Sequence, residues 1–310
     1  MNRQRRRFCR SVMALLLAAG APGLQASVQG EVARRSAALP ARPLRVVVLE
    51  FTFVEMLLEL GITPVGMPEP KHYAQWLGYA SEQLVDVVDV GTRQQPNLEA
   101  VAMLEPDLII ALDYRHMTLF DTLDSLAPTI MMRYDPGAGG VTQLEHTVGA
   151  MQSLSQLVGK MDEAEHQLQQ FSAALEEDRQ ALVGQRGRQV SLMHDLGLGH
   201  IFWAYAGNSM AAGIARHHGL VYTPDSRPGD GMQYVRVDEL IRQEDLHLLL
   251  IAYRQGQDLE TTLADPMWQL VPARQSERIA LLRPNIWAFG SLSSAIRLSR
   301  EMRDSLLRMA

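Results

Sequence analysis

The sequence predicts an α/β protein of two lobes, each built on a parallel-rich sheet, joined by one long rigid α-helix. Two observations predict this fold class. Continuous apolar runs typical of buried strands alternate with helical periodicity in residues 44–140, and again in residues 188–310. Between them, over residues 141–183, apolar side chains recur every three or four positions with no strand-like run. We therefore expect a lobe, a helical connection and a second lobe.

Length and composition agree with this division. A chain of 310 residues can form two domains with buried cores of their own, and 47% hydrophobic with 21% charged residues is typical of a globular protein. The formal net charge is −6, and it becomes −11 without residues 1–26, which hold five arginines and no acidic residue. Nucleic-acid binding depends on neutralising phosphates, so we expect no nucleic-acid partner.

Residues 1–26 have the order of a cleaved export signal. Arg5, Arg6 and Arg7 precede an apolar run of ten residues, and small side chains follow it. The run is roughly half as long as a membrane-spanning helix requires. Adjacent arginines favour a twin-arginine signal, with an ordinary secretory signal as the alternative. We expect a periplasmic protein, and a flexible leader over residues 27–43.

Cys9 is the only cysteine and lies before the apolar run. It is therefore in the wrong place to be the acylated cysteine of a lipoprotein. The mature chain would have no cysteine, which excludes a disulfide framework, a thiolate metal site and a cysteine nucleophile.

The first lobe is predicted to begin with a buried strand at residues 45–49. Thr52 and Glu55 have the spacing of a capping box and predict a helix over residues 53–60. The same kinds of pattern predict strands at 62–66, 107–112 and 129–132, and helices at 97–105 and 119–126.

The connecting segment, residues 141–183, begins with a second capping-box pair, Thr142 and Glu145. One helix of roughly 40 residues would span ~60 Å. The alternatives are two helices broken near Gly159 or a coiled coil. The apolar spacing drifts away from a strict heptad, which argues against a coiled coil.

The second lobe is predicted to contain a strand at 189–193, a helix at 209–218 and a strand at 246–252. The unit that ends in the last strand repeats the pattern of residues 97–112, with a short helix after an acidic residue and then a buried run. The second lobe is therefore expected to be built like the first.

Four segments occur in an order that resembles a known family. They are DVGTRQQPNLE at 89–99, GNS at 207–209, PMWQ at 266–269 and IWAFG at 286–290. Together they resemble the periplasmic ferric-hydroxamate siderophore-binding proteins of bacterial iron ABC importers, from about Arg45 to near the C-terminus. Part of this pattern also occurs in cobalamin, haem and catecholate binders of the same superfamily.

The resemblance implies the helical-backbone fold of that superfamily and a shallow ligand site between the lobes. It implies a monomeric receptor that captures a ferric hydroxamate siderophore and delivers it to the membrane permease of an ABC importer. No enzymatic activity is implied. The siderophore already coordinates its iron fully, so the protein needs no metal ligand and no cofactor of its own.

The resemblance also implies which residues bind the ligand. Arg93 matches the family's ligand arginine, whose N–H donors suit partly negative hydroxamate oxygens. Tyr114 matches a pocket tyrosine and follows a strand end, where open α/β sheets bind ligands. Trp76 and Trp287 match pocket tryptophans, which supply apolar contact area. The alternatives are a surface arginine, a packed loop tyrosine and tryptophans that only fill the core.

The second lobe departs from the family pattern. Relatives carry a tryptophan in the loop before Val237, where this chain has GDGMQY at 229–234. The candidates to replace it are Tyr234, Met232, Trp203 and Tyr205.

Two acidic residues are expected to dock on the permease. Glu99 matches a first-lobe acid that pairs with permease arginines in relatives, and Asp238 or Glu239 is the corresponding residue of the second lobe. The alternative is that these acids only favour the positive N-terminal ends of their helices.

Other function classes have weaker support. The segment GNSMA at 207–211 lacks the last glycine of a nucleophile elbow, and the pairs His194/His200 and His217/His218 match no common zinc spacing. A zinc-binding protein or hydrolase is therefore the weakest alternative. Among chelates, a strongly anionic catecholate complex would require several cationic residues, whereas Arg93 alone stands out, which favours a hydroxamate. A haem would use an axial Tyr or His, and Tyr114 leaves that alternative open.

Overall fold

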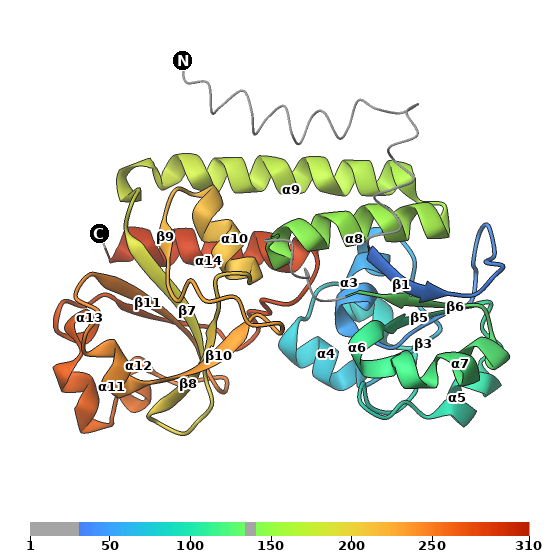
Figure 1. Ribbon diagram of the computed structural model, residues 1–310, viewed down its shortest axis with the longest axis horizontal. Helices are drawn as coiled ribbons and strands as arrows, with labels where there is room; N and C mark the ends of the chain where they lie inside the picture. The colour runs from blue at the N-terminus through green and yellow to red at the C-terminus, as the bar shows by residue number, and fades with distance from the viewer. Residues whose placement is uncertain (1–30, 134–140, 310) are drawn as a thin grey trace, which may run out of the picture.

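The computed structural model describes residues 31–133 and 141–309. Two α/β lobes lie next to each other, and long helices run along one side of both (Figure 1). The predicted fold class, two lobes with parallel-rich sheets and a helical connection, is confirmed. The expected signal at residues 1–26 lies outside the described residues.

The first lobe is built on a six-stranded sheet in the order β1-β6-β5-β2-β3-β4. Every neighbouring pair is parallel except β1 with β6. Its strands are β1 Val32–Arg35, β2 Val46–Val48, β3 Gly66–Met67, β4 Val88–Asp89, β5 Leu108–Leu112 and β6 Thr129–Met132. Its helices are α3 Phe51–Glu59, α4 Pro70–Trp76, α5 Leu98–Met103, α6 Asp113–His116 and α7 Phe120–Leu126, with 3₁₀ turns at Ser81–Leu84 and Met117–Leu119.

The second lobe is built on a sheet in the order β10-β8-β7-β11-β12, with β9 also paired to β7. Strands β7, β9, β11 and β12 are parallel, and β8 and β10 are antiparallel to their neighbours. The strands are β7 Gln189–Asp195, β8 Ile201–Tyr205, β9 Val221–Tyr222, β10 Met232–Arg236, β11 Leu246–Ile251 and β12 Ile279–Leu282. The helices are α10 Met210–His217, α11 Val237–Leu240, α12 Leu259–Thr262, α13 Pro272–Gln275 and α14 Leu292–Arg308, with 3₁₀ turns at Val183–Gln185 and Pro266–Leu270.

The connection over residues 141–183 is two helices rather than one, α8 Gln143–Val158 and α9 Met161–Ala181. The predicted capping box of Thr142 and Glu145 opens α8. Gly159 ends it, because its φ of 70° is a left-handed conformation that glycine adopts without strain. The chain turns back there, and α9 contacts α3 in the first lobe and α10 and α14 in the second (Figure 1). The rigid element shared by both lobes is therefore α9.

Part of the expected flexible leader, residues 27–43, is a strand. Val32–Arg35 form β1, antiparallel to β6 at the edge of the first sheet. Arg34 packs over the ring of Phe120 at 3.8 Å and pairs with Asp121. Arg34 and Arg35 interrupt the apolar pattern that predicts a strand, because both side chains are exposed on the lobe surface.

The first helix begins earlier than predicted, and for a different reason. Glu50 is the N-cap of α3, and the expected capping box of Thr52 and Glu55 does not form. Instead the Thr52 hydroxyl donates to the carbonyl oxygen of Phe289 at 2.6 Å, and Glu55 accepts from residues at the start of α14. Both side chains thus reach into the second lobe.

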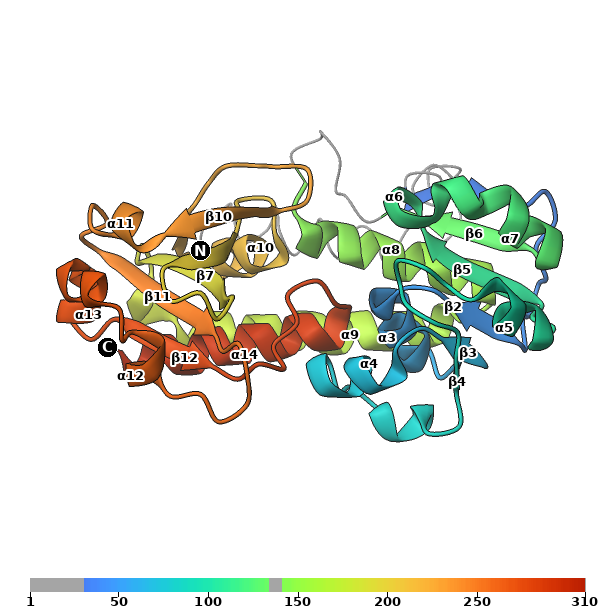
Figure 2. The same cartoon turned by 90° about the horizontal axis from the view of Figure 1, so that it is seen from below.

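We call this contact the interlobe latch: Glu55 and Glu59 of α3 with Ser291, Ser293 and Ser294 at the start of α14. Glu55 accepts from the backbone N–H groups of Ser291 at 2.8 Å and Ser294 at 2.9 Å. Glu59 accepts from the Ser293 N–H at 2.7 Å and from the Ser291 hydroxyl. Both carboxylates are buried. The two carboxylates belong to the first lobe and accept from backbone N–H groups at the N-terminal end of α14, which have no acceptor within that helix. Figure 2 shows α14 reaching α3.

Gly290→Ala is expected to destabilise the protein by about 1–3 kcal/mol, the usual cost of overpacking. A Cβ atom at Gly290 would fall inside van der Waals contact of Ser294 Oγ and Glu55 Oε2, so the latch would have to shift. Urea unfolding measures the effect. The matched control is Gly184→Ala, whose Cβ meets nothing within 4 Å. Equal stability of the two variants would show that the latch is not tightly packed.

Candidate functional site

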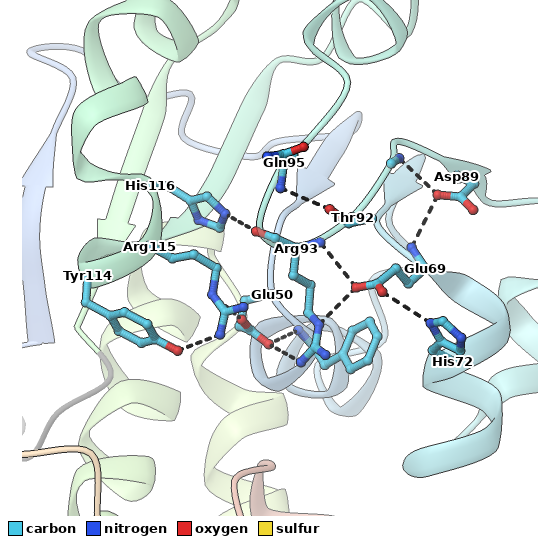
Figure 3. A network of polar contacts seen from close by, with 12 residues as sticks. Glu50, Glu69, His72, Asp89, Thr92, Arg93, Gln95, Tyr114, Arg115 and His116 are labelled. Carbon is cyan, nitrogen blue, oxygen red and sulfur yellow. Dashed lines mark hydrogen bonds and ion pairs between the residues drawn. The ribbon is translucent and has the colours of Figure 1, made fainter.

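Four charged side chains meet at one edge of the first-lobe sheet (Figure 3). Arg115 follows β5, Glu50 follows β2, Glu69 follows β3 and Arg93 follows β4, and these four strands are parallel neighbours. Because parallel strands end at the same edge, their following residues come together there. We call Glu50, Glu69, Arg93 and Arg115 the charged cluster.

The charged cluster is held by ion pairs. The Arg93 guanidinium lies 3.1 Å from Glu69 Oε2 through Nε and 3.4 Å from Glu50 Oε1 through Nη1. Arg115 Nε lies 3.5 Å from Glu50 Oε2. The four side chains are between 5% and 19% exposed, so solvent screens them only partly. Two cations face two carboxylates, and the cluster is electrically balanced.

Glu69 is held in its ionised form. Burial would raise the pKa of its carboxyl, but hydrogen bonds from the backbone and side chain of Arg93 and from His72 outweigh it and lower the pKa below the ordinary value. The carboxylate charge is therefore present at neutral pH.

His116 fixes the segment that carries Arg93. Its Nε2 lies 2.7 Å from the carbonyl oxygen of Arg93, and its Nδ1 accepts from the N–H of Leu112 at 3.1 Å. These partners place the proton on Nε2, which donates to Arg93, and burial lowers the pKa of His116 so that the ring is neutral. His116 was not among the residues predicted from the sequence. The available signal was a histidine within one turn of a predicted strand end.

Three aromatic rings surround the Arg93 guanidinium. Its centre lies 4.1 Å from the ring centroid of Phe51, 5.4 Å from that of Trp76 and 5.8 Å from that of Trp287. Trp76 stacks between His72, at 5.1 Å, and Trp287, at 5.8 Å. Trp287 belongs to the second lobe, so this aromatic wall is shared by both lobes. The structure thus brings Arg93, Trp76 and Trp287 together, and their binding role stays a prediction.

Tyr114 lies beside the charged cluster on α6, next to Arg115 (Figure 3). Its side chain is 63% exposed, and its hydroxyl accepts from Arg115 Nη2 at 2.5 Å. The tyrosine is therefore available to a ligand that contacts Arg115.

Trp203 and Tyr234 form a pair on the second lobe. They are opposite each other on β8 and β10, with ring centroids 6.0 Å apart. The segment expected as a loop before Val237 is in part strand β10, which places Tyr234 on a sheet. Tyr205 and Met232 lie two residues away on the same face, and Tyr205 contacts Phe289 at 5.2 Å. An aromatic stripe therefore leads from Phe289, just before α14, outward over the second sheet.

A small cavity of about 10 Å³ lies where the start of α8 meets the second lobe, lined by Gln143, Asn208, Ser209, Phe289 and residues 229–231. It has room for about one water molecule and is too small for a metal chelate. Ser209 is the N-cap of α10 and accepts from the Ala212 N–H, a structural role in the segment weighed as a nucleophile elbow.

Within residues 31–133 and 141–309, no group of three or more His, Cys, Asp or Glu is arranged to hold a metal ion. His218 is buried against α14, where its Nε2 lies 2.8 Å from Ser299 Oγ, and burial lowers its pKa to about 3. In the same part of the chain, no helix combines the length and apolarity needed to cross a membrane.

The two expected docking residues are exposed. Glu99 lies in the first turn of α5, and Asp238 lies in the first turn of α11 and pairs with Arg236 at 2.9 Å. The two helices belong to different lobes, and both lie on the side of the molecule away from α9 (Figure 1).

Two lobes bridged by a shared helix, with a charged and aromatic site between them, define a binding protein. The chain belongs to the periplasmic binding protein family, whose profile matches residues 46–286. It is similar in structure to the siderophore binding protein FhuD from Vibrio cholerae bound to Fe3+–Desferal, with a TM-score of 0.76 and 28% identity over 86% of this chain and 99% of that chain. The predicted family resemblance is therefore confirmed.

Two curated relatives from Escherichia coli (strain K12) match along most of their length. The Fe(3+) dicitrate-binding periplasmic protein FecB is 28% identical over 289 residues, 91% of this chain and 90% of that protein. The iron(3+)-hydroxamate-binding protein FhuD is 25% identical over 274 residues, 85% of this chain and 87% of that protein. The relatives thus bind ferric complexes of different chemistry.

Proposed function

We propose that this protein is a periplasmic receptor that captures a ferric hydroxamate siderophore between its lobes and delivers it to an ABC importer, with no catalysis of its own. The observation that carries the proposal is the Arg93 guanidinium, held among Phe51 and Trp76 of the first lobe and Trp287 of the second. A chelate that already coordinates its iron requires only hydrogen-bond donors and apolar walls. This site offers both.

The charge of the site favours a hydroxamate over other chelates. The iron centre of a ferric trihydroxamate is electrically neutral, because three singly charged hydroxamates balance the ferric ion. Ferric citrate and tricatecholate complexes are anionic and would gain affinity from excess positive charge. Arg93 and Arg115 are balanced by Glu50 and Glu69. The similarity to the Desferal-bound FhuD supports the same ligand class, and the similarity to FecB makes ferric dicitrate the first competitor to test.

Intrinsic tryptophan fluorescence tests the proposal, since Trp76 and Trp287 flank Arg93. The protein without residues 1–26 is titrated with ferrichrome, ferrioxamine B, ferric dicitrate, a ferric tricatecholate and haem, and with the iron-free siderophores as controls. We expect saturable quenching by the two ferric hydroxamates at the lowest concentrations. Tighter binding of haem, citrate or catecholate, or no binding at all, would contradict the proposed ligand.

Docking on the permease is the second part of the proposal. The double variant Glu99→Lys/Asp238→Lys is expected to reduce siderophore uptake by about tenfold or more, because charge complementarity controls how two surfaces meet. Ligand affinity should not change, since neither residue contacts the charged cluster. The control Glu163→Lys reverses a charge at the start of α9, on the opposite side of the molecule. Normal uptake by the double variant would remove these residues from the docking surface.

A further inference from the structure

A site that binds anions is expected to contain cations without carboxylates beside them. The charged cluster instead contains the carboxylates Glu50 and Glu69. Glu50 is 5% exposed and Glu69 is 15% exposed in their side chains, so both are largely removed from water. Burying a charge is costly unless it is paired, and here each carboxylate is paired with an arginine that faces the site. This pairing cancels the positive electrostatic potential of the arginines, which would otherwise attract an anionic ligand.

Each carboxylate also has one local structural contact: Glu50 is the N-cap of α3, and Glu69 accepts from the backbone N–H of Arg93. Among residues 31–133 and 141–309, Glu50 Oε1 accepts from the N–H of its own neighbour, Phe51, and from Nη1 of Arg93. Glu50 Oε2 is buried, and its contact within the described part of the chain is the ion pair with Arg115 at 3.5 Å, too long for a hydrogen bond. Glu69 accepts from Arg93 and His72. The contacts of both carboxylates are directed mainly at the two arginines.

The arginines keep their capacity for hydrogen bonding despite this balance. A guanidinium has five N–H donors, and Glu50 and Glu69 engage Arg93 through Nη1 and Nε. The flat face of the Arg93 guanidinium also rests on the Phe51 ring. The site therefore offers donors to ligand oxygens without offering net charge.

We propose that Glu50 and Glu69 set the charge selectivity of the site: they cancel the positive potential of Arg93 and Arg115, so that neutral ferric chelates bind and anionic ones are disfavoured. This inference rests on the proposed function and adds the residues that decide among ferric chelates. A carboxylate within a few ångströms of the ligand repels an anion and leaves a neutral complex almost unaffected, because the charge–charge energy is proportional to the charge of the ligand.

The test is a pair of isosteric variants, Glu50→Gln and Glu69→Gln, titrated with neutral ferrichrome and with anionic ferric dicitrate. The quantity compared is the ratio of the two dissociation constants. We expect each variant to shift this ratio toward ferric dicitrate by about tenfold or more at low ionic strength. The shift should shrink as salt is added, because exposed ligand charge is then screened.

Two further variants make the result specific. Glu260→Gln removes the same charge on α12, where Glu260 pairs with Arg274, and should leave the ratio unchanged. Arg115→Gln removes a cation from the cluster and should shift the ratio in the opposite direction. This variant also preserves the test if either glutamine variant fails to fold, which thermal unfolding would reveal.

The outcomes separate this inference from the proposed function. If the unaltered protein binds no ferric chelate, the proposed function itself fails. If it binds ferrichrome but the ratio does not move in either glutamine variant, or moves equally in Glu260→Gln, the charge selectivity of Glu50 and Glu69 is overturned and the receptor function stands.

Discussion

Arg93→Gln is expected to weaken binding of a ferric hydroxamate by roughly 10–100-fold, because hydrogen bonds from a charged donor contribute about 1.5–3 kcal/mol. Glutamine keeps part of the stem and an amide N–H but loses the forked donors and the stacking on Phe51. The measurement is the dissociation constant for ferrichrome from tryptophan fluorescence. An unchanged constant would remove Arg93 from the ligand site.

The same substitution also affects stability. Arg93 is the partner of both Glu50 and Glu69, and its loss leaves Glu69 buried without its cation. We therefore expect Arg93→Gln to lower the melting temperature as well as the affinity. Arg93→Lys keeps the charge without the fork and should be intermediate in affinity.

A double variant separates the two effects. Arg93→Gln/Glu69→Gln leaves one cation, Arg115, facing one carboxylate, Glu50, so it should recover stability without recovering affinity. The control is Arg216→Gln, which breaks the ion pair with Asp225 elsewhere in the second lobe and should leave the affinity unchanged. Recovery of affinity in the double variant would mean that Arg93 acts only by balancing Glu69.

The sequence predicts those parts of the fold that local pattern determines. Val46–Val48 and Leu108–Leu112 read as continuous apolar runs because they are fully buried strands of a parallel sheet. Thr142 caps α8 because both partners of that capping box lie within one turn. The break at Gly159 was visible only as an alternative, because the apolar period continues through it.

The features that the sequence did not predict depend on distant partners. Thr52 and Glu55 have the spacing of a capping box, but Glu55 binds residues 236 and 239 positions away. The strands β8 and β10 were likewise not predicted. The helix α14 was also not predicted, although its buried residues Leu292, Ala295, Leu298 and Met302 recur at helical spacing. A local pattern cannot distinguish a carboxylate that caps its own helix from one that caps a helix of the other lobe.

The candidate site was predicted only in part, for the same reason. Arg93, Trp76 and Trp287 were chosen through the family resemblance, whereas Glu50, Glu69 and His116 were not. Their proximity depends on the strand order β5-β2-β3-β4, which no single segment contains. The available signal was that each follows closely on a predicted strand end.

Glu55→Ala is expected to destabilise the protein by about 3 kcal/mol or more, because each buried donor left without a partner costs about 1–3 kcal/mol. The variant would leave two backbone N–H groups without an acceptor, those of Ser291 and Ser294, which donate to Glu55 at 2.8 and 2.9 Å. Urea unfolding measures the loss, with Glu163→Ala on the surface of α9 as the control. A loss no larger than that of the control would show that the interlobe latch contributes little to stability.

The latch should also make stability depend on pH. Burial, and after it the neighbouring Glu55 carboxylate, raise the pKa of Glu59 to about 8 from an ordinary value of 4.5. The pKa of Glu55 is also raised, chiefly by burial, against hydrogen bonds from Ser291 and Ser294 and the charge of Arg297. Tyr73, which faces the pair, has its pKa raised by burial and stays neutral through this range.

The sign of the pH effect follows from proton binding. The folded state holds the Glu59 proton more tightly than the unfolded state, so this contribution to stability is complete below about pH 4.5 and is lost as pH rises through about 8. One proton corresponds to at most about 1.4 kcal/mol per pH unit. Glu59→Gln carries no charge and keeps an oxygen for the Ser293 N–H, so its stability should not share this decline.

The measurement is the free energy of unfolding in urea from about pH 5 to about pH 9, for the unaltered protein and Glu59→Gln. The difference between them cancels every group that titrates alike in both proteins and leaves the titration of Glu59 together with its effect on the neighbouring Glu55. We expect the unaltered protein to lose stability relative to Glu59→Gln as pH rises, with the steepest change below pH 8. A constant difference would mean that Glu59 is ionised throughout this range and holds a full charge against the N-terminal end of α14.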